Sequence, residues 1–339
     1  MRILVAESRG FSPAAERRLR GLGDVTLADL DRSGLLGAVA GADVLVVRLR
    51  NRVDGEVLAA APGLRAVVSP TTGLDHLDLV ALEGRGVAVL SLRGETAFLR
   101  TVTGTAEHAW ALLLALVRRL PAAAAAARAG DWDRDRFRGR ELAGKTLGVV
   151  GLGRLGSMVA RYGAAFGMRV VAYDPYLDPW PTGAAPERVP SLAALLGACD
   201  VVSLHVPLND ETRGLLGSAA LAAMKPGSVL VNTSRGGVVD EAALVEAVRS
   251  GQLAGAALDV VAGETAPGGV VESPAVAFAS ADDRILLTPH IGGATLESME
   301  NTEIFMAEKL ARWLGGEPVG VDAGPPAAPV APSPHPIPR

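Results

Sequence analysis

Three ionisable side chains, Arg235, Glu264 and His290, each follow an apolar run that is typical of a buried strand. Parallel strands of an open α/β sheet end at one edge, so we expect these side chains to converge there. A guanidinium binds carboxylate and carbonyl oxygens in a planar fork, and an imidazole exchanges a proton near neutral pH. A neighbouring carboxylate would orient the imidazole and favour its protonated form. The set predicts proton transfer to an anionic carbonyl compound, although each residue alone is equally typical of an ordinary surface, loop or helix-cap position.

A glycine-rich turn supplies the second chemical signal. Gly151, Gly153 and Gly156 directly follow the apolar run 146–150 and open a helical pattern. In such a turn the first glycine allows the tight bend, the second lets the backbone approach a pyrophosphate, and the third lets helix pack on strand. The turn therefore predicts a dinucleotide site, with a ligand-free glycine turn as the alternative.

The choice of dinucleotide depends on Asp174, which ends the next strand-like run 18 residues after Gly156. An acid at this position accepts hydrogen bonds from ribose hydroxyls and repels a 2′-phosphate, so we expect NAD rather than NADP. Two readings weaken this preference: Asp174 precedes Pro175 and is also typical of a simple turn, and Arg154 could reach a phosphate. With the first set of residues, NAD predicts hydride transfer to the 2-carbon of a small keto acid.

The elements that must position these residues alternate between apolar runs and amphipathic stretches, which is typical of parallel α/β sheets. The strands expected in a first series are 2–6, 44–47, 65–68 and 87–90, and in a second series 146–150, 169–173, 201–204, 229–232, 256–258 and 285–287. The helices expected between them are 12–22, 54–60, 157–166, 192–196 and 241–250, with two long helices at 101–129 and 297–314. The fold class predicted is α/β with two doubly wound parallel sheets.

Composition limits the possible functions. The 339 residues suggest two domains, and 49% hydrophobic with 21% charged residues is typical of a globular chain. A net charge of −4 without a basic run disfavours nucleic-acid or membrane partners. A single cysteine, Cys199, and an N-terminal apolar run that stops at Glu7 favour a cytoplasmic protein without a signal peptide. No spacing of His, Cys, Asp or Glu predicts a metal site.

The second half of the sequence resembles a known family. The matching stretches are 142–156, 205–208, 224–227, 232–240 and 288–293, and the earlier stretch 72–78 resembles the family's substrate loop. With the ordered Arg, Glu and His, these stretches resemble the D-isomer-specific 2-hydroxyacid dehydrogenases, most closely phosphoglycerate dehydrogenase-like members. The likeness extends over about residues 40–317.

The resemblance implies roles for individual residues. It implies that Arg235 anchors the substrate, Glu264 partners the histidine and His290 donates the proton. The substrate carboxylate would meet backbone N–H groups of Thr71, Thr72 and Gly73. The NAD contacts expected, with the three glycines of the turn, are Thr72, Arg154, Leu155, Asp174, Thr233, Asp259 and Gly293.

The resemblance also implies a domain arrangement. A Rossmann NAD domain, 99–292, would be inserted into a flavodoxin-like substrate domain made of 1–98 and 293–317. Residues 318–339 are rich in proline and alanine, and we expect a disordered tail there. Family members pair through the NAD domain, so a homodimer is expected. Since the chain ends soon after residue 317, we expect no C-terminal serine-sensing domain.

The identity of the substrate stays open at this point. The loop at 69–73 is one residue shorter than expected for phosphoglycerate dehydrogenases, and the 26 residues from Glu264 to His290 form a longer segment than expected. Four arginines flank the expected substrate loops and could bind a second anionic group: Arg48, Arg50, Arg93 and Arg100. Alternatives to a simple 2-hydroxy acid dehydrogenase are a hydroxyphosphonate dehydrogenase with the same mechanism and a non-enzymatic NADH-sensing protein that resembles corepressors of this family.

Overall fold

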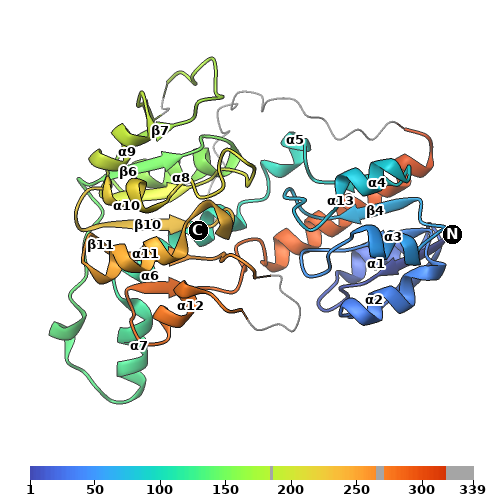
Figure 1. Cartoon of the computed structure of the whole chain (residues 1–339), viewed down its shortest axis with the longest axis horizontal. Coiled ribbons are helices and arrows are strands. Elements are labelled where there is room, and N and C mark those ends of the chain that lie inside the picture. The colour runs from blue at the N-terminus through green and yellow to red at the C-terminus, as the bar shows by residue number, and fades with distance from the viewer. Residues whose placement is uncertain (184–185, 265–270, 318–339) are drawn as a thin grey trace, which may run out of the picture.

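The computed structural model describes residues 1–183, 186–264 and 271–317. The chain forms two α/β bodies side by side, each built around its own sheet (Figure 1). The expected tail, 318–339, lies outside the described residues, as does 265–270 of the long segment between Glu264 and His290.

The first sheet has five parallel strands in the order β2-β1-β3-β4-β5. This is the order of flavodoxin-like sheets. The strands are β1 (Arg2–Val5), β2 (Asp24–Leu27), β3 (Val44–Val46), β4 (Ala66–Ser69) and β5 (Ala88–Ser91). Strand β2 was missing from the sequence prediction, because it is a four-residue edge strand with only Val25 buried and therefore has no continuous apolar run.

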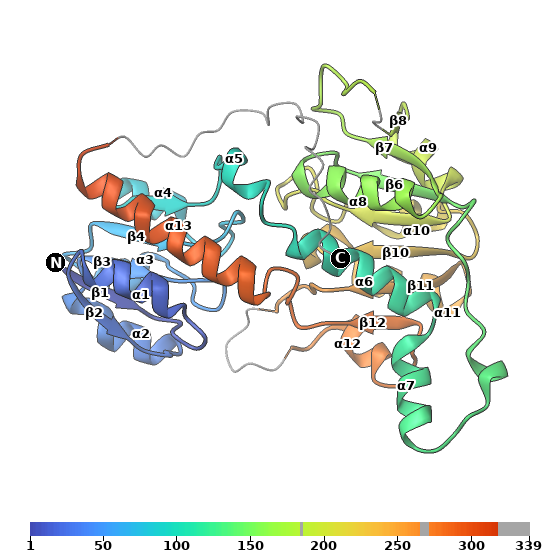
Figure 2. The ribbon, with the colours of Figure 1, turned by 180° about the vertical axis from the view of Figure 1, so that it is seen from behind.

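Helices cover both faces of this sheet. On one face, α1 (Pro13–Arg20) packs beside α13 (Leu296–Leu314), and Leu19 and Leu310 join the buried side chains of the strands. On the other face lie α2 (Arg32–Ala38), α3 (Gly55–Ala60) and α4 (Leu79–Gly84). The C-terminal helix α13 thus returns from the second body to complete the first (Figure 2).

The second sheet has seven parallel strands in the order β12-β11-β10-β9-β6-β7-β8. The six strands from β8 to β11 follow the Rossmann order, and β12 is added beside β11 at the edge. The strands are β6 (Thr146–Val150), β7 (Arg169–Tyr173), β8 (Glu187–Arg188), β9 (Val201–Leu204), β10 (Ser228–Asn232), β11 (Leu253–Leu258) and β12 (Ile285–Leu287). The two-residue β8 escaped prediction because both of its residues are exposed and charged. The predicted fold class, a Rossmann sheet beside a flavodoxin-like sheet, is confirmed.

The faces of the second sheet are covered by α6 (Gly104–Val117) and α8 (Arg154–Ala165) on one side. The other side carries α9 (Leu192–Ala198), α10 (Ser218–Ala222), α11 (Glu241–Arg249) and α12 (Pro274–Ala279). The remaining short elements are α5 (Thr96–Leu99), α7 (Leu120–Arg128) and the 3₁₀ turns η1 (Val39–Gly41), η2 (Arg134–Phe137) and η3 (Gly236–Val238).

The prediction of one long helix over 101–129 is wrong. The chain has separate helices α6 and α7, because Arg119 adopts a left-handed conformation with φ of 52° and Pro121 then starts a new helix. Among the described residues no single helix is long and apolar enough to span a membrane. The segments Thr96–Val117 and Leu120–Arg128 together have the length and composition of a membrane span, but the chain bends by 64° between them.

Candidate active site

The three predicted catalytic residues follow three adjacent parallel strands of the second sheet. Arg235 comes after β10, Glu264 after β11 and His290 after β12. Because these strands run parallel and neighbour one another, their carboxyl ends open on the same edge of the sheet. The topology therefore brings together residues that lie up to 55 positions apart in the sequence.

Glu264 and His290 form a direct pair. The imidazole Nδ1 of His290 lies 2.5 Å from Oε1 of Glu264, and both side chains are about three-quarters buried. The backbone of His290 is left-handed, with φ of 53°, and its N–H donates to the carbonyl of Asp259 at 2.8 Å. Within the described part of the chain Nε2 of His290 has no hydrogen-bond partner, so it is available to a ligand.

Arg235 is held from both bodies of the molecule. Its Nε donates to Oδ2 of Asp75 at 2.6 Å, and its Nη1 donates to the carbonyl of Ser234 at 2.7 Å. Its Nη2 presses on Gly73 so closely that a Cβ added there would lie 1.6 Å from it. Asp75 and Gly73 belong to the loop after β4 in the first sheet, so this contact crosses between the two bodies.

The loop after β4 is ordered by a chain of polar side chains. Thr71 donates from Oγ1 to the carbonyl of Gly73 at 2.8 Å, and Ser69 Oγ lies within hydrogen-bond distance of both Thr71 Oγ1 and His76 Nε2. Burial lowers the pKa of His76 to about 4; the Asp75 carboxylate opposes this shift and Arg235 adds to it. The imidazole is therefore neutral at neutral pH. The backbone N–H groups of Thr71, Thr72 and Gly73 donate to none of the described residues, so they could receive an anion beside Arg235.

The glycine turn has the geometry that a dinucleotide needs. Gly151 has φ of 86°, and a Cβ on Gly156 would lie 2.0 Å from the Gly151 carbonyl oxygen, so both positions require glycine. Gly153, the N-cap of α8, has no protein atom within 4 Å of where its Cβ would be. Since no side chain caps α8, its first N–H groups and the open space at Gly153 fit a pyrophosphate.

Asp174 is tied to this turn. Its Oδ2 accepts a hydrogen bond from the N–H of Leu152 at 2.9 Å, and its Oδ1 accepts one from Tyr176 at 3.0 Å. Each carboxylate oxygen keeps a second lone pair for ribose hydroxyls. The helix that starts at Arg154 also carries Leu155, which is half-buried.

Arg154, which the resemblance implies as an NAD contact, is the first residue of α8. Its Nη1 donates to the carbonyls of Leu99 and Val102, at 3.2 and 2.6 Å, in the crossover from the first body to the second. Burial lowers the pKa of this guanidinium.

Thr233 directly follows β10 and Asp259 directly follows β11. The buried Asp259 carboxylate accepts hydrogen bonds from Thr288 Oγ1 and from the N–H groups of Ile291 and Gly292, at 2.6 to 2.9 Å, so it shapes the loop that presents His290. Thr233 is buried, and its Oγ1 has no partner. This unpaired hydroxyl at the end of β10 fits a hydrogen bond to a bound cofactor. Gly293, also expected at the cofactor, is exposed.

Two of the four arginines considered for a second anion already form ion pairs with carboxylates. Arg48 forms an ion pair with the buried Glu303 of α13, whose pKa is raised by burial, and Arg50 pairs with Asp29 at 2.6 Å. Arg93 and Arg100 are exposed, and Arg100 has an interaction partner. The paired guanidinium groups are poor candidates for anion binding, because an incoming anion would have to displace a carboxylate.

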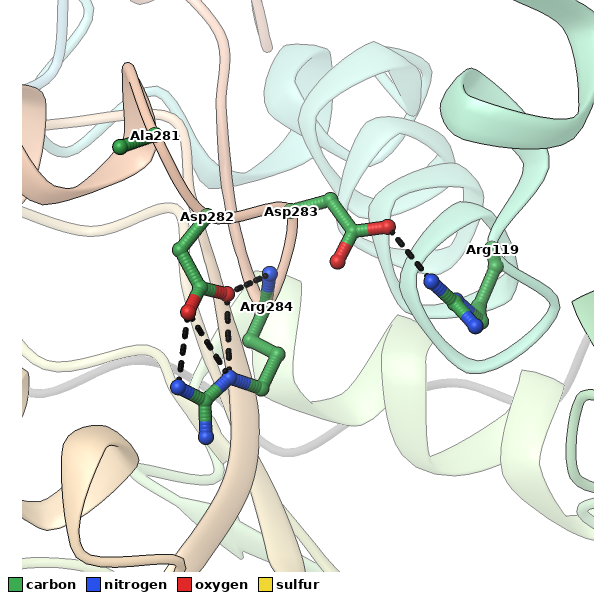
Figure 3. A pocket seen from close by; sticks show the side chains of 5 residues that line it. All are labelled: Arg119, Ala281, Asp282, Asp283 and Arg284. Atoms are coloured by element: carbon green, nitrogen blue, oxygen red, sulfur yellow. Dashed lines mark hydrogen bonds and ion pairs between the residues drawn. The ribbon is translucent and has the colours of Figure 1, made fainter. Parts of the chain in front are cut away.

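A depression on the protein surface is separate from these residues (Figure 3). It is lined by Arg119, Ala281, Asp282, Asp283 and Arg284, and the last three of these directly precede β12. The depression therefore lies at the amino ends of the strands, whereas the three predicted catalytic residues follow the carboxyl ends. Its charges are paired, Arg119 with Asp283 at 2.9 Å and Arg284 with Asp282 at 2.7 Å. The described residues contain no His, Cys, Asp and Glu cluster that could hold a metal, and burial raises the pKa of Cys199 to about 12.

Sequence reasoning missed three residues around the site. Asp75 lay within the quoted substrate loop but was given no role. His108, on α6, was given no role either; its Nε2 lies within hydrogen-bond distance of Asp259 and Thr288 beneath the His290 loop. Glu241, buried on α11, could not be predicted from any sequence pattern, because its contact with Ala262 depends on how two separate segments pack.

Comparison with known proteins identifies relatives over most of the chain. The sequence model for "D-isomer specific 2-hydroxyacid dehydrogenase, NAD binding domain" matches residues 110–292. D-3-phosphoglycerate dehydrogenase of Mycobacterium tuberculosis is 44% identical over 296 residues, covering 87% of this chain and 54% of the relative. This chain thus spans about half the length of that relative.

Two further proteins match at nearly full length. (S)-sulfolactate dehydrogenase of Chromohalobacter salexigens is 40% identical over 298 residues, covering 86% of this chain and 91% of the relative. The crystal structure of D-lactate dehydrogenase from Aquifex aeolicus, complexed with NAD and lactic acid, superposes with a TM-score of 0.81 at 28% identity, covering 94% of this chain and 96% of the other.

Proposed function

Because the chain belongs to the D-isomer-specific 2-hydroxyacid dehydrogenases and contains the NAD-binding domain of that family, we propose that it is a dehydrogenase of this kind. It would transfer a hydride between NAD(H) and the 2-carbon of a small 2-hydroxy or 2-keto acid. The observation that carries the proposal is the Glu264–His290 pair, 2.5 Å long, with Nε2 of the imidazole available. It stands at the same sheet edge as Arg235, whose guanidinium adjoins the unpaired N–H groups of the loop after β4.

Each residue then has a task in the reducing direction. Arg235 and the N–H groups of Thr71, Thr72 and Gly73 bind the substrate carboxylate, and Asp75 holds the guanidinium in place through Nε. NADH, when bound at the glycine turn, would supply the hydride for the carbonyl carbon. His290 gives its proton to the carbonyl oxygen as charge develops there, and Glu264 stabilises the protonated imidazole before the transfer.

The cofactor and domains follow the same proposal. We assign the pyrophosphate to the turn at Gly151–Gly156, the ribose to Asp174 and the nicotinamide to the unpaired hydroxyl of Thr233. We place the substrate domain at 1–98 with 293–317 and the NAD domain at 99–292. Closing one on the other would exclude water from the reacting atoms. A cytoplasmic location stays a prediction.

A homodimer paired through the NAD domain is also proposed. The segment after α6 extends from this domain as α7, none of whose residues is buried within the chain (Figure 2). Nearby Trp132 is 84% exposed. A second copy of the chain would cover this surface.

The test of function is an NADH-oxidation screen with glyoxylate, hydroxypyruvate, 3-phosphohydroxypyruvate and a phosphonate analogue. We expect turnover of at least one keto acid. Preference for a compound with a second anion would favour the phosphorylated or phosphonate substrates. NADH binding without turnover of any compound would instead favour the NADH-sensing alternative.

The acid role is tested by His290→Ala. Turnover should fall by about 100-fold or more, because the carbonyl oxygen loses its proton donor. The dissociation constant for NADH, measured by fluorescence titration, should stay within about twofold of wild type, since binding does not use the proton. Retained turnover would remove His290 from this role.

A further inference from the structure

A buried carboxylate behind the predicted catalytic pair is not used by the proposed mechanism. Glu241 is the first residue of α11 and is 6% exposed. Its Oε1 accepts a hydrogen bond from the backbone N–H of Ala262 at 2.5 Å, and its buried Oε2 has no partner. A buried oxygen without a partner costs stability, so stability alone is a poor reason for an acid here.

The contact with Ala262 acts on the turn that carries Glu264. Within this turn, 261–264, the Glu264 side chain folds back so that Oε2 accepts from the N–H of Val261 at 3.2 Å while Oε1 faces His290. Two adjacent backbone N–H groups, of Val261 and Ala262, are thus each bound by a carboxylate. Glu241 supplies one of them from a different element.

The same turn is pressed against the loop that carries Arg235. A Cβ on Gly236 would lie 2.0 Å from the carbonyl carbon of Val261, so the two backbones are in direct contact. Arg235 precedes Gly236, and α11 begins three residues after Val238 of η3. This contact joins the turn that carries Glu264 to the loop that carries Arg235, and Glu241 binds the same turn.

We propose that Glu241 is a positioning residue, which holds the 261–264 turn through the N–H of Ala262 so that Glu264 keeps its hydrogen bond to His290. This rests on the proposed function for its catalytic consequence. Other ionisable groups around the pair are Asp259 with His108, beneath the backbone of His290, and Arg235 with Asp75 on the neighbouring loop. Among the described residues Glu241 forms no hydrogen bond or ion pair with any of these four groups.

The test compares three variants. Glu241→Ala removes the acceptor for Ala262, whereas Glu241→Gln keeps a carbonyl oxygen that can accept the same hydrogen bond. Asp240→Ala is the matched control: Asp240 caps the same helix through the N–H of Ala243 and does not bind the turn, so its loss weakens α11 alone.

The decisive readout is the separation of kcat from substrate and cofactor binding in keto-acid reduction. In Glu241→Ala we expect kcat to fall about tenfold, because Glu264 no longer orients His290, while the KM for the keto acid and the binding of NADH stay unchanged. Glu241→Gln and Asp240→Ala should keep the wild-type kcat.

Other outcomes overturn the proposal. An unchanged kcat in Glu241→Ala would show that Glu264 does not depend on Glu241. An equal fall of kcat in Glu241→Gln would assign the effect to charge, and an equal fall in Asp240→Ala would assign it to helix stability.

Hydrogen exchange decides the proposal separately from activity. If wild type reduces no keto acid, the proposed function fails, and the peptide covering 258–264 is then followed by mass spectrometry. Faster exchange there in Glu241→Ala, but not in Glu241→Gln or Asp240→Ala, supports the positioning role. Unchanged exchange rejects it.

Discussion

At the scale of single residues, the candidate site is a set of charges that are each oriented by a neighbour. Arg235 has Asp75, His290 has Glu264, and Asp259 gathers the N–H groups of the His290 loop. A guanidinium or imidazole with a fixed partner keeps its remaining N–H groups in a defined direction. This preorganisation is the main contribution that side chains make to charge development in a transition state.

A residue-scale prediction concerns cofactor choice. In Asp174→Ala, NAD should bind about tenfold more weakly, because a charge-assisted hydrogen bond to the ribose is lost. NADP should bind no more weakly than before, because the repulsion of its 2′-phosphate is also lost. Isothermal titration with both dinucleotides checks this, and an unchanged ratio of the two affinities would contradict the ribose assignment.

At the scale of elements, β6, the glycine turn and α8 form one unit in which glycines have different tasks. A side chain at Gly156 would collide with the Gly151 carbonyl, whereas one at Gly153 would meet only open space. Gly153 has φ of −70°, which any residue adopts. Packing of helix on turn thus depends on Gly156, and access by a ligand depends on Gly153.

The element-scale prediction separates these tasks. Gly156→Ala should lower the free energy of unfolding by about 1–3 kcal/mol, because backbone must shift to admit the methyl group. Gly153→Ala should cost about 1 kcal/mol or less but weaken NADH binding, because the methyl group would occupy the space assigned to the pyrophosphate. Urea unfolding and fluorescence titration measure the two effects. Equal losses of stability would contradict the assignment.

At the scale of the whole molecule, two chain crossovers and the Asp75–Arg235 contact join the bodies. The first crossover contains α5, and the second leads into α13, which packs on the first sheet (Figure 1). Arg154 reaches from the glycine turn to the first crossover. The substrate loop is therefore in contact with the second body, and the helix after the glycine turn is in contact with the first crossover.

A pH dependence of stability is predicted from two histidines, the buried His76 in the first body and the half-buried His205 in the second. Burial lowers the pKa of both His76 and His205 to about 4. Unfolding would return each to about 6.5, so the unfolded chain binds more protons between these values. The stability of the neutral histidines is full above about pH 6.5 and is lost as pH falls towards 4, by up to about 3 kcal/mol each.

Urea unfolding at pH 7 and pH 5 checks this dependence. Wild type should be less stable at pH 5, and the difference should shrink in the double variant His76→Asn, His205→Asn. A difference of the same size in the double variant would mean that other groups, such as paired carboxylates, cause it.

The strand boundaries show which strands can be predicted from the local sequence pattern. The buried strands Thr146–Val150 and Val201–Leu204 were predicted to the residue, because a strand covered on both faces is almost continuously apolar. The exposed edge strands Asp24–Leu27 and Glu187–Arg188 carry no such pattern. The break at Arg119 also lacked a clear signal, since the alanine-rich stretch after it is itself helical.

The sequence by itself determined the two sheets, the glycine turn and the types of residue at the carboxyl ends of the strands, because these depend on local periodicity and on which backbone angles a residue permits. Only the tertiary structure decided that Asp75 binds Arg235, that His108 binds Asp259 and that Glu241 binds Ala262. These partners are 160, 151 and 21 residues apart, and their contact depends on how separately folded elements pack and on the rotamers that this packing leaves available.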